Sequence, residues 1–565
     1  MARARTTLSR LAVNATLAGF WASALLALLV FYVNSGVSLT TRSFLSVALP
    51  VAVVYAPLTG IVWAMLAGMV RLFVAFRIPV PWVGFRTFWR FLVGDFFLVC
   101  LAYLHNLDQA RDYLPITIQR SLASATLLLV AGTTMLAVDA IWRGLTRRRL
   151  RRAAVLAAAI LMCGGLFLIR QRYREVRRPS SASEIEVVRP AHAILWLGLD
   201  GVTPDDLLPM AADGRLPFLG ALLRAGTSAP LTAPRPPRLA AAWATVVTGR
   251  NPAAHGVVEP FPFQPAAGSA TFRVVPTGTG LRRLLRYGLL GARTAAARPA
   301  VPTIDRILAR CGYRVIAGGW DTLLEDTRLA GAPAPVAPSP GPDIAEQVER
   351  VEEHIRMARS RAGGAVLAVA LETALAADMA AGNMVLTHLA AAAGRPEARP
   401  AVLLHMSGLD RVAHTFTRYR HPERFGNVSA QDVERFGEVI PDYERFLDAW
   451  LGRLSHLLAP EPTVVVVSPY AVGPVGILRR VRQTVLGSSP RSGTHAGAGP
   501  GFLLLAGPGV KPGGVLETAR SADVLPTLLY LTDLPVGRDM EGEVLDGAVS
   551  ARFAGRHAVV GPSVW

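Results

Sequence analysis

The stretch that decides the fold of the C-terminal two thirds is 193–201, which reads AILWLGLDG. An unbroken apolar run ends at Leu199, and Asp200 and Gly201 follow it at once. Continuous apolar runs are typical of buried parallel strands, and polar residues just past the carboxyl ends of such strands are where α/β sheets place their chemistry. We therefore predict a buried strand here, with Asp200 at the functional edge of a sheet.

Downstream of this strand, similar short apolar runs alternate with helical patterns such as 442–458, DYERFLDAWLGRLSHLL. Strand and helix alternation over this length predicts an α/β domain with a doubly wound, mostly parallel sheet, which we place at 191–565. Two stretches rich in Pro, Gly and Ala, 260–300 and 325–345, are expected to be loop insertions. The further strands are expected at 315–317, 402–405, 464–468 and 502–506.

Upstream of the strand, the first third of the chain is dominated by long apolar runs. A helix needs ~20 apolar residues to cross a bilayer, and the pattern predicts a bundle of about five transmembrane helices over 1–170, followed by a linker at 171–190. The first run is too long for a cleavable signal peptide, and further spans follow it. The apolar runs are 11–33, 44–70, 88–104, 119–142 and 153–169.

Arginines between the runs predict the orientation of this bundle. They are concentrated at the N-terminus, at 71–86 and at 143–152, and are sparser in the other two loops. The positive-inside rule places these three segments in the cytoplasm. The arginines at 170–178 argue against this orientation, but the cluster at 147–152, on the other side of the last apolar run, opposes them. We expect a multi-pass protein of the cell (inner) membrane, with the C-terminal domain on the periplasmic or extracellular side.

Composition excludes several other function classes. The net charge of +19 arises largely from arginines beside apolar segments, and without a basic and aromatic motif it predicts no nucleic-acid partner. Cys311 is the only cysteine of the C-terminal domain, so neither an internal disulfide nor a CxxC metal motif is available there. Asp95, within an apolar run, is either a functional intramembrane carboxylate or, as we expect, paired with a nearby arginine or placed at the membrane interface. Intramembrane charges are too few to indicate a transporter.

The most specific local signal is the pentapeptide Asp410-Arg-Val-Ala-His414 after the strand at 402–405. Residues four apart share one face of a helix, so this carboxylate and imidazole can converge on one ion. A surface salt bridge or a capping role would produce the same pattern. The presence of Asp200 and of His495 supports the interpretation of this pentapeptide as part of an ion-binding site.

Five segments, in this order, resemble the type I phosphodiesterase/nucleotide pyrophosphatase branch of the alkaline phosphatase superfamily. The resemblance extends over about 190–550 and implies two metal ions, usually zinc, beside a Thr or Ser nucleophile. It assigns one ion to Asp410, His414 and His495, and the other to Asp200, the nucleophile and an Asp-His pair from an SDHG motif. The segments are LGLDG (197–201), AWATVVTGRNPAAHGV (242–257), GLDRVAHTF (408–416), GTHAGAGPGFLLLAGPGVKPG (493–513) and ADVLPTLLYLTDLPVGRDMEGEVL (522–545).

The sequence departs from this pattern at the second ion. Counting back from Thr248, the nucleophile position falls on Leu239, and the strand that should end in SDHG has Pro469 and Tyr470 in place of the Asp-His pair. Leucine has no lone pair, and Asp200 cannot hold a zinc ion by itself. We expect one zinc ion, at the first set, and the loss of the second site and of the nucleophile. Tyr470 is expected to fill the vacated space, or to donate a hydrogen bond to a bound anion.

Two functions remain open. The first is a non-catalytic or atypical family member (a pseudoenzyme) that binds a phosphorylated or anionic ligand of the cell envelope. The alternative is a one-metal hydrolase or transferase that acts on phosphate or sulfate esters of envelope lipids or glycans, with water activated at the remaining ion. Neither of these two functions identifies a particular substrate. Nearby residues have weaker claims: the hydroxyls of Thr232, Thr245 and Ser468, a loop-positioning His255, and Arg238 and Arg250 as anion contacts if they point inward.

Overall fold

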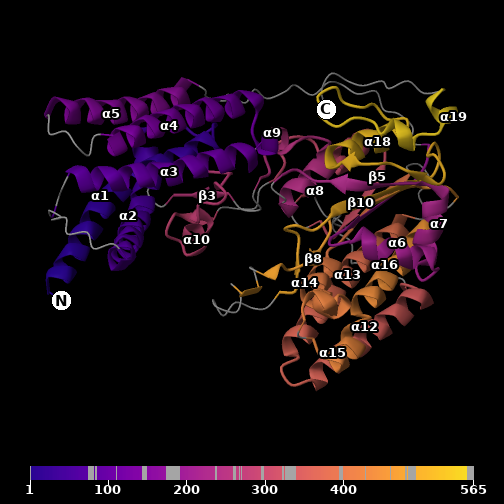
Figure 1. Cartoon of the computed structure of the whole chain (residues 1–565). Coiled ribbons are helices and arrows are strands. Elements are labelled where there is room, and N and C mark those ends of the chain that lie inside the picture. The colour runs from indigo at the N-terminus through magenta and orange to yellow at the C-terminus, as the bar shows by residue number, and fades with distance from the viewer. Residues whose placement is uncertain are drawn as a thin grey trace. The chain divides into compact units, whose positions relative to one another are not determined.

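The computed structural model divides the chain into two compact units (Figure 1). One comprises Met1–Pro179 with Gly256–Ala297, and the other Ser180–His255 with Arg298–Trp565. Most of the expected linker, 173–190, lies outside the described residues. The structure describes residues 2–73, 82, 85–109, 111–142, 149–172, 191–235, 238–258, 262–265, 268, 270–293, 298–320, 323–324, 339–392, 399–426, 428–458, 460–477, 480–481 and 491–555.

The first unit is built on five apolar helices at the N-terminus, as predicted. The first four contain segments that are long and apolar enough to cross a membrane, and α5 contains the fifth predicted run. Their number, length and composition indicate a multi-pass membrane protein. The helices are α1 (Ala2–Tyr32), α2 (Thr41–Phe73), α3 (Phe85–Gln109), α4 (Ile116–Trp142) and α5 (Arg149–Arg172).

One buried acidic residue in this unit has a neutral partner. Asp95 on α3 was predicted to pair with an arginine or to lie at the membrane interface; in the structure its Oδ1 atom accepts a hydrogen bond of 2.7 Å from the indole nitrogen of Trp63 on α2. An indole N–H is a neutral donor that suits an apolar environment, so no second charge needs to be buried. The pair joins α2 to α3.

The second unit contains an eight-stranded sheet in the order β11-β2-β10-β7-β1-β6-β5, with β12 added beside β2. Strand β1 is parallel to both β6 and β7, and only β10 runs against its two neighbours. The doubly wound, mostly parallel sheet predicted from the sequence is thereby confirmed. The strands are β1 (Ile194–Leu199), β2 (Thr227–Thr232), β5 (Arg314–Gly318), β6 (Pro400–Met406), β7 (Thr463–Tyr470), β10 (Pro500–Ala506), β11 (Gly514–Val515) and β12 (Ala519–Arg520).

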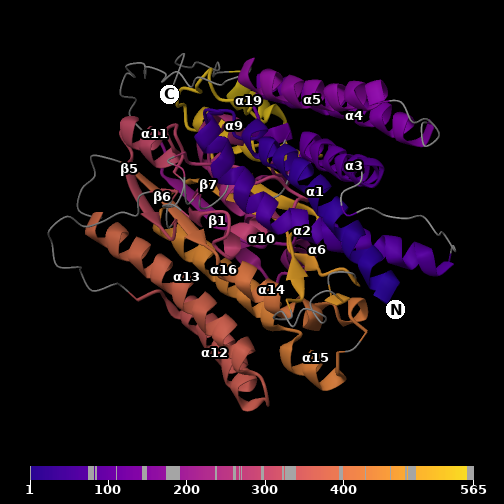
Figure 2. The ribbon, with the colours of Figure 1, turned by 90° about the vertical axis from the view of Figure 1, so that its left-hand side faces the viewer.

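Helices cover both faces of this sheet. Leu195 and Leu197 of β1 contribute to a core shared with α12, α13, α14 and α16, which are close together in Figure 2. Ile194 and Trp196, whose side chains point to the other face, join a core shared with α8, α11 and α18. The bounds are α8 (Leu239–Thr248), α11 (Ile304–Arg310), α12 (Pro342–Ser360), α13 (Ala365–Ala392), α14 (Gly408–Arg420), α16 (Val439–Leu457) and α18 (Val524–Leu531).

Two segments differ from simple expectation. α13 is long and apolar enough to cross a membrane, yet Leu371, Ala374 and Val385 are buried in the core of the sheet domain. Of the expected insertion at 325–345, residues 325–338 lie outside the described part, and α12 already begins at Pro342. The remaining smaller elements are α6 (Pro204–Ala212), α7 (Pro217–Ala225), α9 (Pro252–His255), α10 (Leu281–Arg286), α15 (Ala430–Phe436), α19 (Ala551–Ala554), β3 (Phe263–Gln264), β4 (Ala292–Arg293), β8 (Gly473–Pro474) and β9 (Gly493–Thr494).

The sheet register brings the expected functional segments to one edge. Leu199 of β1 pairs with Met406 of β6, and Gly198 pairs with Val467 of β7. Because these three strands are parallel, Asp200 and the start of α14 follow carboxyl ends at the same edge of the sheet where Tyr470 ends β7.

Candidate functional site

Asp410, His414 and His495 come together at this edge. Asp410 lies in the first turn of α14, and His414 follows one turn later on the same face. The Oδ1 atom of Asp410 is 3.0 Å from Nε2 of His495 and 3.5 Å from Nε2 of His414. Among the residues that the structure describes, this is the one group of three or more His, Cys, Asp or Glu side chains with ligand atoms within 4.8 Å of one another.

Backbone carbonyls fix the orientation of both imidazoles. Nδ1 of His414 donates to the carbonyl of Gly493 at 2.7 Å, and Nδ1 of His495 donates to the carbonyl of Ala471 at 3.0 Å. With the proton on Nδ1, each Nε2 presents a lone pair toward Asp410. This is the arrangement in which outer partners orient histidines that bind a metal.

Gly493 makes this arrangement possible by its lack of a side chain. A Cβ atom at this position would lie 2.6 Å from the carbonyl oxygen of Ala413 and 2.9 Å from Cα of His414. β9 can therefore lie directly against α14, which places the carbonyl of Gly493 within reach of His414. Ser492 adds a backbone bond, donating its amide to the carbonyl of His414 at 2.9 Å.

The chemistry of the three side chains fits a divalent metal ion. Asp410 Oδ1 is buried and makes no hydrogen bond of standard geometry, despite the two imidazoles beside it. Donor atoms that share a tetrahedral zinc ion at ~2.1 Å lie ~3.4 Å apart, which is close to the spacing seen here. One carboxylate with two imidazoles is a donor set that zinc accepts, with a further position left open.

The charges within the group shift its pKa values in different directions. Burial raises the pKa of Asp410, but the close contact with His495 and the charge of His414 more than offset this, so its pKa lies below the ordinary value. Burial lowers the pKa of His414, whose imidazole is therefore neutral at neutral pH. Burial also lowers the pKa of His495, but the contact with Asp410, the charge of Asp410 and the bond to the Ala471 carbonyl together outweigh it, so the pKa lies above the ordinary value.

Asp200 belongs to a different cluster. Its Oδ1 atom accepts a hydrogen bond of 2.6 Å from the indole of Trp243, and its Oδ2 atom is 3.2 Å from Nε2 of His405. His405 in turn is bonded through Nδ1 to the carbonyl of Gly319 at 3.0 Å and stacks on Trp320. Burial lowers the pKa of His405, and the charge of Asp200 raises it to a net value above the ordinary one.

Asp200 therefore lies beside the group formed by Asp410, His414 and His495 without joining it. A Cβ atom on Gly201 would meet Cα of Asp410 at 2.7 Å, so the two segments are in direct contact. Within the described residues, no third His, Cys, Asp or Glu completes a ligand group around Asp200 and His405. His405 was missed in the sequence because a histidine inside an apolar strand resembles any other strand residue.

Tyr470 links His495 to the start of α8. Its hydroxyl donates to the carbonyl of Arg238 at 2.8 Å and accepts from the amide of Arg238 at 2.9 Å. Its ring lies 5.6 Å from that of His495. Leu239 comes next as the first residue of α8 and is 37% exposed, while Pro469 is buried within β7.

The other candidate residues serve the surrounding fold. Ser468 Oγ donates to the carbonyl of Tyr470, Thr245 Oγ1 to that of Ala241, and Thr232 Oγ1 to that of Ala519. His255 is fully buried, with its Nε2 atom 3.1 Å from the hydroxyl of Thr245, which is consistent with a role in positioning its loop.

The two candidate arginines are also largely buried. Arg250 forms an ion pair with Asp539, so its charge is already matched within the fold. Arg238 is 9% exposed, and its backbone is held by Tyr470. The ion pair with Asp539 argues against a role of Arg250 as an anion contact, and the role of Arg238 stays a prediction.

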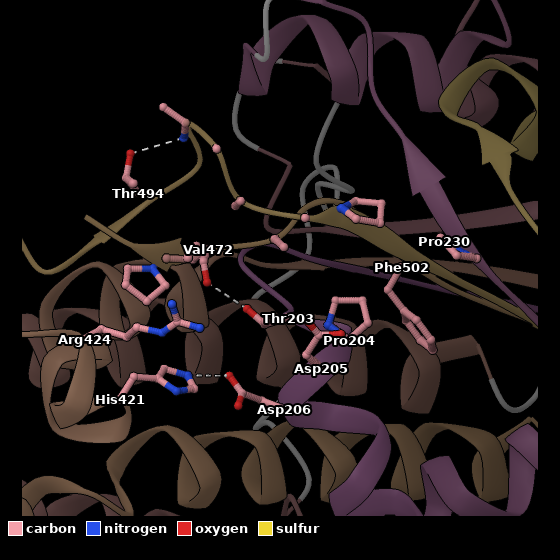
Figure 3. Close-up of a pocket in the computed structure, with 18 of the residues that line it drawn as sticks. Thr203, Pro204, Asp205, Asp206, Pro230, His421, Arg424, Val472, Thr494 and Phe502 are labelled. Carbon is pink, nitrogen blue, oxygen red and sulfur yellow. Dashed lines mark hydrogen bonds and ion pairs between the residues drawn. The ribbon is translucent and has the colours of Figure 1, made fainter. Parts of the chain in front are cut away.

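A cavity of about 1120 Å³ adjoins the loop that carries His495 (Figure 3). Thr494 and Ala496, the neighbours of His495, line it, as does Ala471. Its walls are mostly apolar, and the pair formed by His421 and Asp206 at 3.2 Å provides polar groups. Other lining residues include Pro204, Pro230, Val472, Val475, Ile477 and Phe502.

Comparison with known proteins identifies one family. The model of the type I phosphodiesterase/nucleotide pyrophosphatase family matches residues 194–484, more than half of the 565-residue chain. No curated protein matches.

Solved structures that resemble the chain include two of murine ectonucleotide pyrophosphatase/phosphodiesterase 5. One, an inactive variant in complex with AMP, is 13% identical, covers 61% of this chain and 96% of its own, and has a TM-score of 0.34. The other is 14% identical with the same coverage and a TM-score of 0.35. A phosphonate monoester hydrolase from Silicibacter pomeroyi is 17% identical, covers 66% of this chain and 78% of its own, and has a TM-score of 0.34.

Proposed function

The chain belongs to the type I phosphodiesterase/nucleotide pyrophosphatase family, and from that premise we propose that it binds one zinc ion at Asp410, His414 and His495 and holds a phosphate-bearing ligand there. The single observation that carries the proposal is the buried Oδ1 atom of Asp410, which two oriented imidazoles approach without a hydrogen bond of standard geometry. When bound, the ion would supply positive charge and an open coordination position for a phosphate or sulfate oxygen.

The residues of this chain prepare that position in two ways. The lowered pKa of Asp410 keeps its carboxylate charged at neutral pH. The carbonyls of Gly493 and Ala471 hold both Nε2 atoms in the direction of the carboxylate. The cavity beside His495 offers room for a ligand larger than phosphate itself.

We further propose that the covalent two-metal reaction of the family does not operate in this chain. Leu239 has no atom that can attack phosphorus, and Tyr470 is bonded to the backbone just before it. Both oxygens of Asp200 are engaged, one by Trp243 and one by His405. These contacts favour a non-catalytic or atypical family member over an ordinary phosphodiesterase.

The second candidate function is a one-metal hydrolase or transferase acting on phosphate or sulfate esters of envelope lipids or glycans. It is favoured by the intact donor set. In a group kept only for packing, the buried oxygen of Asp410 would be expected to accept a hydrogen bond, but it accepts none of standard geometry. An apolar cavity next to the loop of His495 would suit an ester with a non-polar part.

The proposed location is the cell (inner) membrane, with the sheet domain on the periplasmic or extracellular side. The support is the concentration of arginines at the N-terminus, at 71–86 and at 143–152. A chain held in the bilayer by its helices would then meet ligands of the cell envelope. Fusion of reporters that are active on only one side of the membrane to residue 555 tests this orientation.

The function itself is tested on the full-length protein in detergent. Zinc content is measured by mass spectrometry, binding of inorganic phosphate by calorimetry, and hydrolysis with a chromogenic phosphodiester. Asp410→Ala and His414→Ala should remove both zinc and phosphate binding. His456→Ala is the matched control, because His456 also bonds a backbone carbonyl through Nδ1 (Gly452, 2.7 Å) but lies outside the ligand group.

The outcomes separate the candidates. About one zinc ion per chain with phosphate binding and no turnover supports the binding function. Turnover that the two site variants abolish and His456→Ala retains supports the one-metal hydrolase. No zinc at saturating concentration contradicts both.

A further inference from the structure

We propose that residues 256–297 are an internal docking segment by which the helical unit holds the C-terminal part of the chain, in addition to the covalent linker at 173–190. In sequence the segment interrupts the sheet domain, between His255 and Arg298. In the structure its contacts place it with the five N-terminal helices. The inference concerns attachment and is independent of the proposed function.

The first anchor of the segment is Asn34, which follows α1. Its Oδ1 atom accepts the amides of Arg273 and Val274 at 2.8 and 2.9 Å, and its Nδ2 donates to the carbonyl of Val274 at 2.7 Å. The side chain is 6% exposed. A buried amide that satisfies both backbone groups of one residue replaces the partner that a neighbouring strand would offer.

The second anchor repeats this pattern on another helix. Asn106, near the end of α3, accepts the amide of Thr277 at 2.8 Å and donates to its carbonyl at 3.0 Å. It is 1% exposed. Two asparagines on two helices therefore hold the same short stretch of backbone, 273–277, which argues that the helices are built to receive it.

Close approach to α2 and α3 requires two glycines in the segment. Gly278 and Gly280 have φ values of +71° and +78°, in the left-handed region that favours glycine. A Cβ atom on Gly278 would lie 2.8 Å from the ring of His105, and one on Gly280 would lie 2.8 Å from the hydroxyl of Tyr55. That hydroxyl donates to the carbonyl of Thr279 at 2.6 Å.

Aromatic packing adds an apolar contact to these polar ones. Phe272 is fully buried between Phe263, on which it stacks at 5.2 Å, and Phe31 of α1, which it meets edge-on at 5.2 Å. Phe31 and Phe263 are buried as well. Without the helices, this cluster would be exposed to water.

Arg170 of α5 stabilises the turn that carries Asn34. Its guanidinium is 2% exposed and donates to the carbonyls of Phe31, Asn34, Ser35 and Val37 at 2.7, 3.2, 3.1 and 2.8 Å. A cation at these carbonyls satisfies the end of α1. The receptor for the segment thus includes α1, α2, α3 and α5.

The stem of the segment is fixed within the sheet domain. The amide of Ala300 donates to the carbonyl of His255 at 2.9 Å. The residues just before and just after the segment are therefore bonded to each other. The imidazole of His255 contacts the hydroxyl of Thr245 on α8, the helix that Leu239 begins. Docking of 256–297 would therefore retain the domain that carries the candidate site.

The experiment uses the full-length protein with a protease site placed within 173–190 and an affinity tag on the N-terminus. After cleavage in detergent, the C-terminal fragment should remain bound to the tagged helices. The variant Asn34→Ala/Asn106→Ala should release most of it. Asn14→Ala is the matched control: this buried asparagine of α1 also donates to two carbonyls, those of Arg10 and Trp82, and both of these residues lie outside the segment.

Amide hydrogen exchange on the uncleaved protein guards against a variant that fails to fold. The amides of Arg273, Val274 and Thr277 should exchange slowly in the original protein and at least tenfold faster in the double variant, while β1 and β7 remain protected in both. Release of the fragment from the original protein on cleavage would overturn the inference. Equal retention in the double variant, or equally fast exchange of the three amides in both proteins, would do the same.

Discussion

The hydroxyl of Tyr470 is bonded to both backbone groups of Arg238, at 2.8 Å to the carbonyl and 2.9 Å to the amide. Its ring lies against His495 at the same time. The resemblance to the family assigns a metal-binding histidine to position 470 and the nucleophile to position 239. Under the proposed function, Tyr470 acts as a structural link that ties the start of α8 to His495, at the position where the family pattern expects a metal ligand.

The first prediction concerns this link. Tyr470→Phe should lower the free energy of unfolding by about 1–3 kcal/mol, because two buried backbone groups of Arg238 lose their partner. Thermal unfolding of the full-length protein measures the loss. Zinc content should stay unchanged, because Tyr470 supplies no ligand atom, and a Tyr470→Phe protein that loses its zinc would argue against this role.

Leu239→Thr should not restore phosphodiester hydrolysis. The hydroxyl would be in place, but the second metal would still lack its Asp-His pair, and Asp200 is held by Trp243. Turnover of a chromogenic phosphodiester should remain at the level of the unchanged protein. A clear gain from this single substitution would show that the second site is less degraded than its residues indicate.

Gly493→Ala should weaken zinc binding at least tenfold. The added Cβ atom would meet the carbonyl of Ala413 at 2.6 Å, and β9 would have to move away from α14. The carbonyl that orients His414 would move with it, and loss of such outer partners typically costs ~10–100-fold in metal affinity. Gly499→Ala is the control, because nothing lies within 4 Å of its added atom. Equal zinc affinity in both variants would contradict the role of Gly493.

Asp200→Asn should leave zinc content unchanged while lowering stability. The amide oxygen can still accept from Trp243, but the charged contact with His405 is lost. A loss on the order of 1–3 kcal/mol in the free energy of unfolding is expected for such a buried contact. If zinc disappears along with the carboxylate, Asp200 is a ligand after all.

Glu444 predicts a pH dependence of stability. The side chain on α16 is buried, and burial together with the charge of Asp206 raises its pKa from 4.5 to about 8. The native state therefore holds a proton that the unfolded state releases between these values, so stability is full below pH 4.5 for this group and falls as pH rises toward 8.

Glu444→Gln should remove this dependence. The variant should be more stable than the original protein above pH 8, by an amount on the order of a few kcal/mol, and nearly equal to it near pH 5. Thermal unfolding across this range measures both curves. Parallel curves would mean that Glu444 is charged in the native protein.

The fold and the pairing of Asp410 with His414 could be predicted because their signals are local. The run at 193–199 is apolar throughout, and Asp410 and His414 are one helical turn apart. The identification of His495 as a candidate ligand required the family pattern, because its partner Asp410 lies some eighty residues earlier in the chain.

The remaining features depend on contacts that leave no local pattern. Nothing in the sequence around His405 or Trp243 indicates that both meet Asp200, and the segment at 256–297 looked like a loop insertion because its partners, Asn34 and Asn106, are polar residues among apolar helices. α13 shows the converse: its apolar composition reflects burial in the sheet domain, where Asp378 accepts the amides of Ser407 and Gly408 ahead of α14.

Zinc content and phosphate binding of the full-length protein test the central claim most directly. The account predicts about one zinc ion per chain and phosphate binding that requires it, both lost in His414→Ala and retained in His456→Ala. A protein that binds two zinc ions and hydrolyses the phosphodiester, or one that binds phosphate equally well without zinc, would contradict it.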